Sequence, residues 1–308
     1  MSATRTIESI VGGADSNPGH KRDVAPAEYL RAWLRAASLK TFAATAAPLA
    51  LGAALAYSEG SFRWKIFLLS ALCFALIHII GNMLRLAYSA RELKPGEYYD
   101  PAREIASPRD LKITAAVLTA LAVGFGMIIA LLTSKVALAI GLMSLIFAYI
   151  AAGGPFPISI PASGRALVFI LYGISAALGS YYVNAMHIAW NGVLLSAVPG
   201  LLGAALYDAR NLDGARSAVT SKIEPDPYEL DEDENSKFLG AAVIFVYLII
   251  ALLALSLSRW GLLVGFASLP FAAKLLRDSG RAGASCGALA NELLIVTSLA
   301  LSFAFIVF

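Results

Sequence analysis

The sequence predicts an all-α membrane protein, in which nine transmembrane helices form a bundle with a cavity open to the cytoplasm. Of its 308 residues, 58% are hydrophobic and only 15% are charged. The mean hydropathy is +0.71, which is too high for an ordinary soluble domain. The apolar residues fall into nine separate windows, and the charges fall mainly on alternate loops between them. These two patterns together predict the number of helices and their orientation.

Each of the nine windows is apolar enough to cross a bilayer, which takes about 20 mostly apolar residues in a helix. The windows are residues 41–57, 66–86, 111–133, 136–152, 166–186, 188–206, 238–257, 260–274 and 293–308. The window at 260–274 is the shortest. Nine crossings place the two termini on opposite sides of the membrane.

Charge in the loops predicts which side is cytoplasmic. Four of the 24 Lys and Arg residues lie on one side, namely Arg63, Lys65, Lys135 and Arg259. The other 20 lie on the side of the N-terminus, so the positive-inside rule places the N-terminus in the cytoplasm and the C-terminus outside. Of the 21 acidic residues, only Glu59 lies on the outer side. The net charge of +3 thus reflects topology and gives no support to nucleic-acid binding.

The chain divides into a polar N-terminal segment and one membrane domain. Residues 1–26 are polar and are predicted to be a disordered cytoplasmic segment, whereas residues 27–308 form the nine-helix domain. At its start, "AEYLRAWLRAASL" places Leu30, Trp33, Leu34 and Ala37 on one helical face. This pattern predicts an interfacial helix on the cytoplasmic surface.

Three polar breaks interrupt the apolar pattern on the cytoplasmic side. Two are long charged connections, at 89–110 and 208–237, and the third is the Gly- and Pro-rich "AAGGPFPISIPASG" after the fourth window. Irregular backbone at membrane depth is tolerated only where protein shields it or where it lines a cavity. The breaks therefore predict a cavity that opens to the cytoplasm.

Four stretches of the sequence resemble one family. They are "LRAASLKTFAATAAPLALGAALAYSEG", "IHIIGNM", "YIAAGGPFPISI…GSYYV" and "LLGAALYDARNLDGARSA", and they occur in the family's order. Over about residues 30–308 the chain resembles the UbiA-type intramembrane prenyltransferases, especially the branch that prenylates 1,4-dihydroxy-2-naphthoate in menaquinone synthesis. The resemblance implies a nine-helix fold, a polyprenyl diphosphate substrate, and two aspartate-rich motifs that hold Mg²⁺ against the diphosphate.

The first of those motifs is degenerate in this chain. The family pattern reads approximately Asn-Asp, two residues, then Asp, and alignment through "IHIIGNM" places it on Arg85, Leu86 and Ser89. Both aspartates are therefore absent. The upstream Asn82 is retained, and Arg85 brings a positive charge to the position of a family asparagine.

The second motif is degenerate in the same way. Its pattern reads Asn-Asn-x-Arg-Asp, three residues, then Asp, and it begins at Tyr207 and Asp208. Arg210 matches the family arginine, but Asn211 and Ala215 replace the two aspartates. Four expected metal-ligand positions thus lack carboxylates.

Two interpretations of the site follow. In the first, nearby residues rebuild a Mg²⁺ site, with Asp208 and Asn211 as catalytic and metal-binding residues and Glu92 as a further ligand, because helical spacing places them on matching faces. Asp213 lies well around the helix and is a poorer candidate.

In the second interpretation, cations hold the diphosphate directly, since arginine forks match phosphate oxygens without metal. The residues expected to bind the diphosphate are Lys40, Asn82, Arg85 and Arg210. Three further cations are expected near the cavity mouth, namely Arg91, Lys94 and Arg216. For Arg91 and Lys94, ordinary positive-inside charge is at least as good an explanation.

Other polar and aromatic residues have a structural alternative. His78 could line the cavity one turn before Asn82, although a hydrogen-bonded core histidine is the more common case. The tyrosines near the predicted cavity could stabilise a carbocation through their ring faces, but such residues more often pack between helices. They are Tyr149, Tyr172, Tyr181 and Tyr182.

Two functions remain open on the sequence. The first is a prenyltransferase that moves a polyprenyl group from its diphosphate to an aromatic or other lipid-soluble acceptor through a divergent site, with the participation of Mg²⁺ undecided. The second is a non-catalytic paralogue that binds isoprenoid or quinone-type lipids, or that partners an active homologue in the membrane. Loss of four ligand positions favours the second by chemistry, whereas the resemblance favours the first.

The predicted topology can be tested with reporters fused to the two ends of the chain. A reporter that works only in the cytoplasm should be active when it is fused before Met1 and inactive when it is fused after Phe308. A reporter that works only outside should show the opposite pattern. Fusions after Glu59 and after residue 100 serve as internal controls for the two sides. Activity of both terminal fusions on one side would contradict a nine-helix topology.

Overall fold

The computed structural model of the chain describes residues 26–38, 41–89, 107–153, 161–220, 232–279 and 285–308. Every regular element within these ranges is a helix. The elements are α2 (Pro26–Ala36), α3 (Phe42–Ser58), α4 (Trp64–Ser89), α6 (Pro108–Leu132), α7 (Lys135–Ala151), α8 (Pro161–Phe169), the π-helix η2 (Ile170–Leu178), α9 (Gly179–Ala185), α10 (Trp190–Thr220), α11 (Glu232–Ser256), the 3₁₀-helix η3 (Trp260–Ser268), α12 (Leu269–Asp278) and α13 (Cys286–Val307).

The protein is an integral, multi-pass, all-helical membrane protein. Seven helical segments of the described chain are long and apolar enough to cross a membrane. They are Trp64–Tyr88, Pro108–Leu132, Ser163–Ala185, Trp190–Gly214, Glu234–Ser256, Trp260–Asp278 and Cys286–Val307. The other two predicted windows coincide with the shorter apolar helices α3 and α7, of 17 residues each. The count of nine crossings therefore stays a prediction of the sequence.

The two helix boundaries that differ most from those that hydropathy predicts have the same cause. Hydropathy alone predicts that α10 ends near residue 206 and that α13 begins near residue 293, but α10 continues to Thr220 and α13 begins at Cys286. The carboxylate of Asp213 in α10 accepts hydrogen bonds from the backbone N–H groups of Cys286 and Gly287, each at 2.8 Å. Because the polar turn of one helix caps the start of the other, both helices extend beyond their apolar segments.

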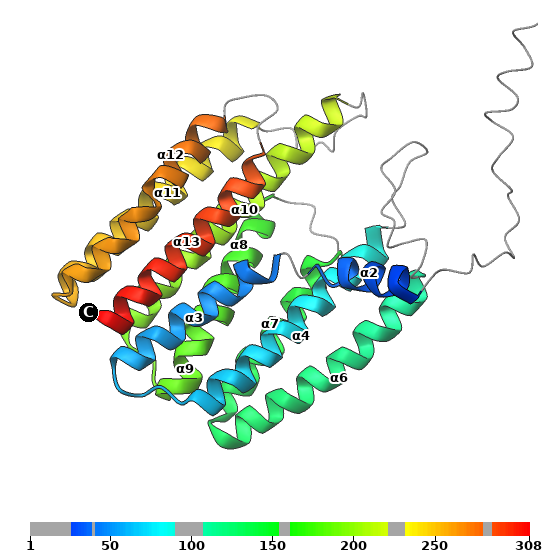
Figure 1. Cartoon of the computed structure of the whole chain (residues 1–308), viewed down its shortest axis with the longest axis horizontal. Helices are drawn as coiled ribbons and strands as arrows, with labels where there is room; N and C mark the ends of the chain where they lie inside the picture. The colour runs from blue at the N-terminus through cyan, green and yellow to red at the C-terminus, as the bar shows by residue number, and fades with distance from the viewer. Residues whose placement is uncertain (1–25, 39–40, 90–106, 154–160, 221–231, 280–284) are drawn as a thin grey trace, which may run out of the picture.

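The helices run side by side along one common direction, and α2 lies across one end of them (Figure 1). We call this end the α2 end. The C-terminus lies at the opposite end, together with the turn between α3 and α4 (Figure 1). The main core packs α3, α10, α11 and α13 together with η3 and α12, and a smaller apolar cluster joins α4, α6 and α7.

Helix α2 packs on the bundle through Ala36 and Trp33. These residues contact a cluster that includes Met83 of α4 and Leu111 of α6, while Leu30 and Leu34 of the expected apolar face remain exposed. An exposed apolar edge beside Arg31 and Arg35 is the arrangement expected of a helix at the membrane surface. Its place in the membrane interface remains a prediction.

The closest helix contact in the core depends on a glycine. A Cβ at Gly52 of α3 would lie 1.9 Å from the carbonyl oxygen of Ala177 and 2.9 Å from the backbone nitrogen of Tyr181. Both neighbours are backbone atoms of η2 and α9, so they cannot rotate away. The bundle therefore requires a residue without a side chain at this crossing.

Substitution of Gly52 by alanine is expected to lower the free energy of unfolding in detergent by about 2 kcal/mol or more, because the two backbones must separate. Gly124 of α6 is the matched control, since a Cβ there meets nothing within 4 Å. Gly124→Ala is expected to be neutral or to stabilise by up to about 1 kcal/mol. Equal unfolding midpoints for the two variants, measured by thermal denaturation, would contradict the close approach of α3 to η2.

Candidate active site

Arginines of the two degenerate motifs lie within electrostatic range of His78 on α4. The charges of Arg85 on α4 and Arg210 on α10 both act on its ring. The two arginines align separately with the two family motifs. The described part of the predicted site is therefore rich in positive charge.

His78 itself is fixed by hydrogen bonds to the first turn of α3. Its Nδ1 lies 3.0 Å from the Thr45 hydroxyl, and its Nε2 lies 3.3 Å from the Thr41 hydroxyl. The edge of its ring also contacts Phe42, with 5.7 Å between the ring centroids. One turn further along α4, the Asn82 side-chain amide donates to the His78 carbonyl at 2.9 Å. These contacts anchor α3 to α4 beside the two arginines.

Asp208 has a different environment, because it is fully buried and paired with Arg165 of α8. The Arg165 Nε lies 2.9 and 3.0 Å from the two carboxylate oxygens of Asp208. The same guanidinium donates to Glu234 at 2.6 Å and to the Asn235 side chain at 2.9 Å, and it lies 4.6 Å from the centroid of the Phe238 ring. Arg165 thus links α8, α10 and α11, and the pairing satisfies a carboxylate that would otherwise be costly to bury.

Asp208 and Arg210 face different sides of α10. Residues two positions apart on an α-helix are separated by about 200° around its axis, so their side chains point nearly opposite ways. Asp208 faces Arg165 and α11, whereas Arg210 is exposed and lies beside the start of α13, where a Cβ at Gly287 would be 3.0 Å from the Arg210 Cγ. Asn211 is half-buried between these directions. The proposed residues of the second motif therefore do not share one surface.

The next charged residues of α10 stabilise the neighbouring helices. Asp213 caps the start of α13, which agrees with its poor position for a metal ligand. Arg216 donates to the backbone carbonyl of Ser279 and lies 3.5 Å from the Cys286 sulfur. The sequence alone places Arg216 at the cavity mouth, but the fold directs it to the α12–α13 connection.

Several predicted residues lie outside the described chain. These are Lys40 and Glu92, the other charged residues of 90–106, and the "GPFPISI" segment at 154–160. Among the residues that the structure does describe, no group of three His, Cys, Asp or Glu side chains converges on one point. Because Arg165 contacts both oxygens of Asp208, the described residues do not form a Mg²⁺ site by themselves.

Arg165 is the main site residue that sequence reasoning missed. A signal for it was present, since Arg165 is an isolated charge at the very start of an apolar window and Asp208 is an isolated acid near the end of another. Charges in such positions usually pair with one another. Sequence alone, however, does not say which of the nearby arginines the aspartate meets.

An apolar pocket lies deeper in the bundle, between α4, α6, α7 and the η2–α9 segment. Its lining includes Cys73 and Ile77 of α4, Ile129 of α6, Leu145 of α7 and Ser175 of η2. Ile77 directly precedes His78 on α4, so a residue that lines the pocket is next in sequence to the histidine on which Arg85 and Arg210 act. Such a lining is suited to a hydrocarbon chain.

Three of the tyrosines considered near a reaction centre have other contacts. The Tyr182 hydroxyl lies 2.7 Å from the Ser134 hydroxyl, and the Tyr149 hydroxyl lies 2.8 Å from that of Thr119. Tyr181 contacts Glu59 at the end of the bundle opposite α2. These hydrogen bonds tie helices together.

Comparison with known proteins adds sequence relatives and solved structures. No family model matches the chain. The 1,4-dihydroxy-2-naphthoate octaprenyltransferase of Mycobacterium tuberculosis (strain ATCC 25618 / H37Rv) is 28% identical over 188 residues, which are 58% of this chain and 63% of that protein. The chain thus spans somewhat less than two thirds of that relative. The protein of the same name from Mycobacterium leprae (strain TN) is 24% identical over 259 residues, covering 82% of this chain and 87% of the relative.

Two solved structures share the fold over almost their whole length. A UbiA homolog from Archaeoglobus fulgidus, bound to GPP and Mg²⁺, has a TM-score of 0.68 at 14% identity and covers 89% of this chain and 99% of that one. A digeranylgeranylglyceryl phosphate synthase has a TM-score of 0.63 at 16% identity and covers 91% and 98%. The chain is thus similar in sequence to two 1,4-dihydroxy-2-naphthoate octaprenyltransferases and shares the fold of a UbiA homolog.

Removal of Arg165 should be far more damaging than removal of an exposed arginine. Arg165→Met leaves the Asp208 carboxylate buried without a partner, and we expect the free energy of unfolding to fall by about 3–5 kcal/mol. The double variant Arg165→Met, Asp208→Asn should recover a large part of that loss. Arg277→Met is the control, because Arg277 pairs with Asp278 on the surface and should change stability by less than about 1 kcal/mol. Equal losses for Arg165→Met and Arg277→Met would show that the buried pair is not formed.

Proposed function

We infer that the protein transfers a polyprenyl group from its diphosphate to an aromatic or other lipid-soluble acceptor. Similarity to proteins named octaprenyltransferases supports prenyl transfer in general. The observation that carries the proposal is that Arg85 and Arg210, one from each degenerate motif, both act electrostatically on His78, so two permanent positive charges lie in one region of the bundle. A site of this charge suits a ligand with several negative charges.

The diphosphate would be held mainly by cations. Arg85 and Arg210 can each offer a planar fork of N–H donors to phosphate oxygens, and Asn82 beside them can add an amide donor. Lys40, just before α3, is the fourth proposed contact. The prenyl chain would lie in the apolar pocket that begins beside Ile77.

The reaction needs charge stabilisation on the leaving group. The allylic C–O bond breaks, the diphosphate keeps the electron pair, and the acceptor forms a bond to the allylic carbon and loses a proton. Cations that contact the diphosphate stabilise this transition state because its negative charge grows as the bond breaks. Water must be kept from the allylic carbon, and the apolar lining of the pocket serves that purpose.

Participation of Mg²⁺ is a separate part of the proposal. The proposed ligands remain Asp208, Asn211 and Glu92, with Asp208 and Asn211 also as catalytic residues, and a bound Mg²⁺ would supply further neutralisation of the diphosphate. For Asp208 to take that role, Arg165 would have to release it. The metal-dependent site therefore requires a rearrangement of α8 against α10, whereas the arginine site does not.

The alternative function is a non-catalytic protein that binds isoprenoid or quinone-type lipids, or that partners an active homologue. It is favoured by the engagement of Asp208 with Arg165, because this pairing takes up the buried carboxylate of the second motif. The proposed orientation is the same for both functions, with the α2 end, the N-terminus and the site on the cytoplasmic side.

Binding of geranylgeranyl thiolodiphosphate to the purified protein separates these possibilities. We expect binding in EDTA as well as in Mg²⁺, and Arg210→Ala should weaken it about 10- to 100-fold in both, because a hydrogen bond to a charged group is worth about 1.5–3 kcal/mol. Arg277→Ala, which removes an exposed arginine of α12, is the matched control and should leave binding unchanged. Equal binding by wild type and Arg210→Ala would refute the arginine-held diphosphate.

The metal arm of the same experiment uses Asp208→Asn. If binding disappears in EDTA, and if Asp208→Asn removes the effect of Mg²⁺ while the folded protein is retained, the rebuilt metal site is supported. Turnover of labelled geranylgeranyl diphosphate with an aromatic acceptor then distinguishes an enzyme from a binding protein. Tight binding with no product for any lipid-soluble acceptor would favour the non-catalytic alternative.

A further inference from the structure

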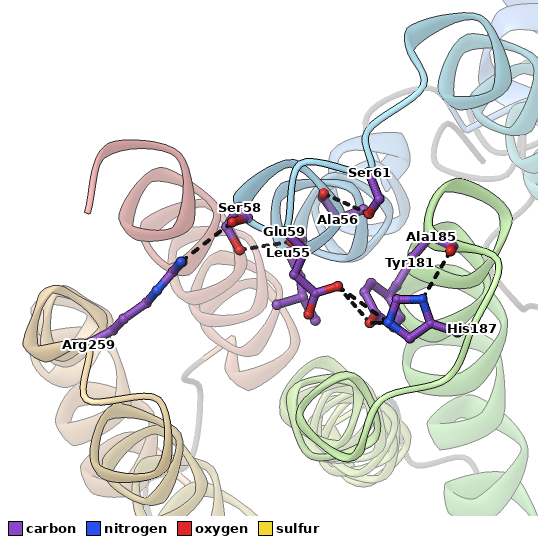
Figure 2. A network of polar contacts seen from close by, with 9 residues as sticks. All are labelled: Leu55, Ala56, Ser58, Glu59, Ser61, Tyr181, Ala185, His187 and Arg259. Atoms are coloured by element: carbon purple, nitrogen blue, oxygen red, sulfur yellow. Dashed lines mark hydrogen bonds and ion pairs between the residues drawn. The ribbon is translucent and has the colours of Figure 1, made fainter.

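Three polar side chains meet at the end of the bundle opposite α2, where the family motifs have no residue. Glu59 follows α3, Tyr181 lies on α9, and His187 follows α9 (Figure 2). The Tyr181 hydroxyl lies 2.8 Å from Glu59 Oε2 and 2.9 Å from His187 Nε2. His187 Nε2 is also 3.7 Å from the same carboxylate oxygen. The group joins the α3–α4 connection to the α9–α10 connection.

The backbone fixes the orientation of the histidine. Helix α9 ends at Ala185, and Met186 has a φ of 62°, a left-handed conformation that is uncommon for a residue with a side chain. This turn brings the His187 ring back over the helix end, where its Nδ1 lies 3.0 Å from the Ala185 carbonyl oxygen. A carbonyl oxygen can only accept, so this contact is a hydrogen bond when Nδ1 carries a hydrogen.

The remaining contacts need one more proton than the neutral histidine and the charged glutamate provide. With its hydrogen on Nδ1, a neutral His187 presents a lone pair at Nε2. The Tyr181 hydroxyl has a single hydrogen and can donate either to Glu59 or to His187, but not to both. Both short contacts are hydrogen bonds only if an additional proton lies on Nε2 or on the Glu59 carboxyl group. In the first case Nε2–H donates to the Tyr181 oxygen, whose hydroxyl donates to Glu59.

The surroundings favour this proton on electrostatic grounds. A cation is stabilised at a helix C-terminus, and His187 lies at the C-terminus of α9 while Glu59 is the residue that ends α3. Tyr181 is only 1% exposed, which limits the water available to compensate a broken hydrogen bond.

Two arginines lie against the same connections, and both are directed to backbone carbonyls. The Arg63 guanidinium donates to the carbonyls of Asn184 (3.1 Å) and Val183. The Arg259 guanidinium lies 3.5 Å from the Ser58 carbonyl (Figure 2). Neither side chain titrates in the ordinary pH range. Within the described chain, the basic side chain that contacts the Glu59 carboxylate is therefore His187.

We propose that Glu59, Tyr181 and His187 form a proton-binding site that ties the α3–α4 connection to the α9–α10 connection, and that the tie is released when the proton is lost to water. Loss of the proton leaves two lone pairs facing each other at one of the two contacts, so one contact must open. The site lies at the end of the bundle opposite α2, away from Arg85 and Arg210, and the proposal does not depend on prenyl transfer. By the predicted topology it faces the outer compartment.

The direction of the pH effect follows from the proton count. With all three contacts formed as hydrogen bonds, the folded site contains one proton that is not needed once the three side chains are apart. The stabilisation is therefore complete at acidic pH and is lost as pH rises and the folded protein releases the proton.

The test is a double-mutant cycle with Glu59→Gln and His187→Gln, measured as thermal unfolding of the full-length protein in detergent. One series is run at pH about 5.5 and one at about 8.5, on either side of the ordinary pKa of histidine. We expect a coupling of about fivefold or more in the unfolding equilibrium constant at the lower pH, and less than about twofold at the higher pH. The same coupling at both pH values would overturn the proposal, because a merely structural contact has no such pH dependence.

The matched control is the cycle of Glu59→Gln with His78→Gln, since His78 is the other described histidine and lies on α4 among Thr41, Thr45 and Phe42. It should show no coupling at either pH. Should a Glu59 or His187 variant fail to fold, hydrogen–deuterium exchange of wild type decides the matter. Protection of residues 56–62 and 183–190, corrected for the intrinsic effect of pH, should fall at the higher pH, and unchanged protection would overturn the proposal.

Discussion

Burial of the Asp208 carboxylate against the Arg165 guanidinium is the interaction on which the arrangement of the α2 end depends. Neither charge could lie at this depth alone, and Arg165 reaches a second carboxylate and an amide on α11 with its remaining donors. The pair therefore brings α8, α10 and α11 to one point. A single guanidinium with partners on two other helices leaves little freedom for any of them to shift independently.

That pairing divides α10 into two functional sides. The acidic side is directed into the bundle and is satisfied by Arg165, whereas Arg210 is exposed and lies beside the start of α13. Solved structures with the same overall fold include a protein bound to GPP and Mg²⁺. In this chain the four aspartate positions of the motifs lack carboxylates and Arg85 adds a positive charge, and this change is the physical reason to propose that phosphate is held directly by arginine.

Charges at the two ends of the bundle are stabilised in different ways. At the α2 end, carboxylates and guanidinium groups pair with one another or cap helices, as Asp213 does for α13. At the opposite end, Arg63 and Arg259 bind backbone carbonyls near helix C-termini, and Glu59 contacts a tyrosine and a histidine. A carboxylate next to a helix C-terminus is unfavourable, and contacts with the Tyr181 hydroxyl and the His187 ring offset part of that cost.

Much of the fold was predictable because hydropathy and helical periodicity are local. The nine apolar windows all fall mainly on helices, and the amphipathic segment at 27–39 contains most of α2. The boundaries of α10 and α13 were not predictable, since they depend on a contact between Asp213 and a backbone more than 70 residues away. For the site, the degenerate motifs on α4 and α10 were identified from the resemblance to a family, but the grouping of Asp208 with Asn211 as metal ligands used helical position without knowledge of Arg165 on the neighbouring helix.

The sequence by itself determined that the chain is a multi-pass helical membrane protein and that leucine, serine, asparagine and alanine stand at the four aspartate positions of its motifs, because composition and pattern are written in consecutive residues. Only the tertiary structure decided that Asp208 pairs with Arg165 and that Glu59 meets His187 through Tyr181. Those partners come from different helices, and an ion pair or hydrogen bond forms only where packing brings its two groups within about 3 Å of each other.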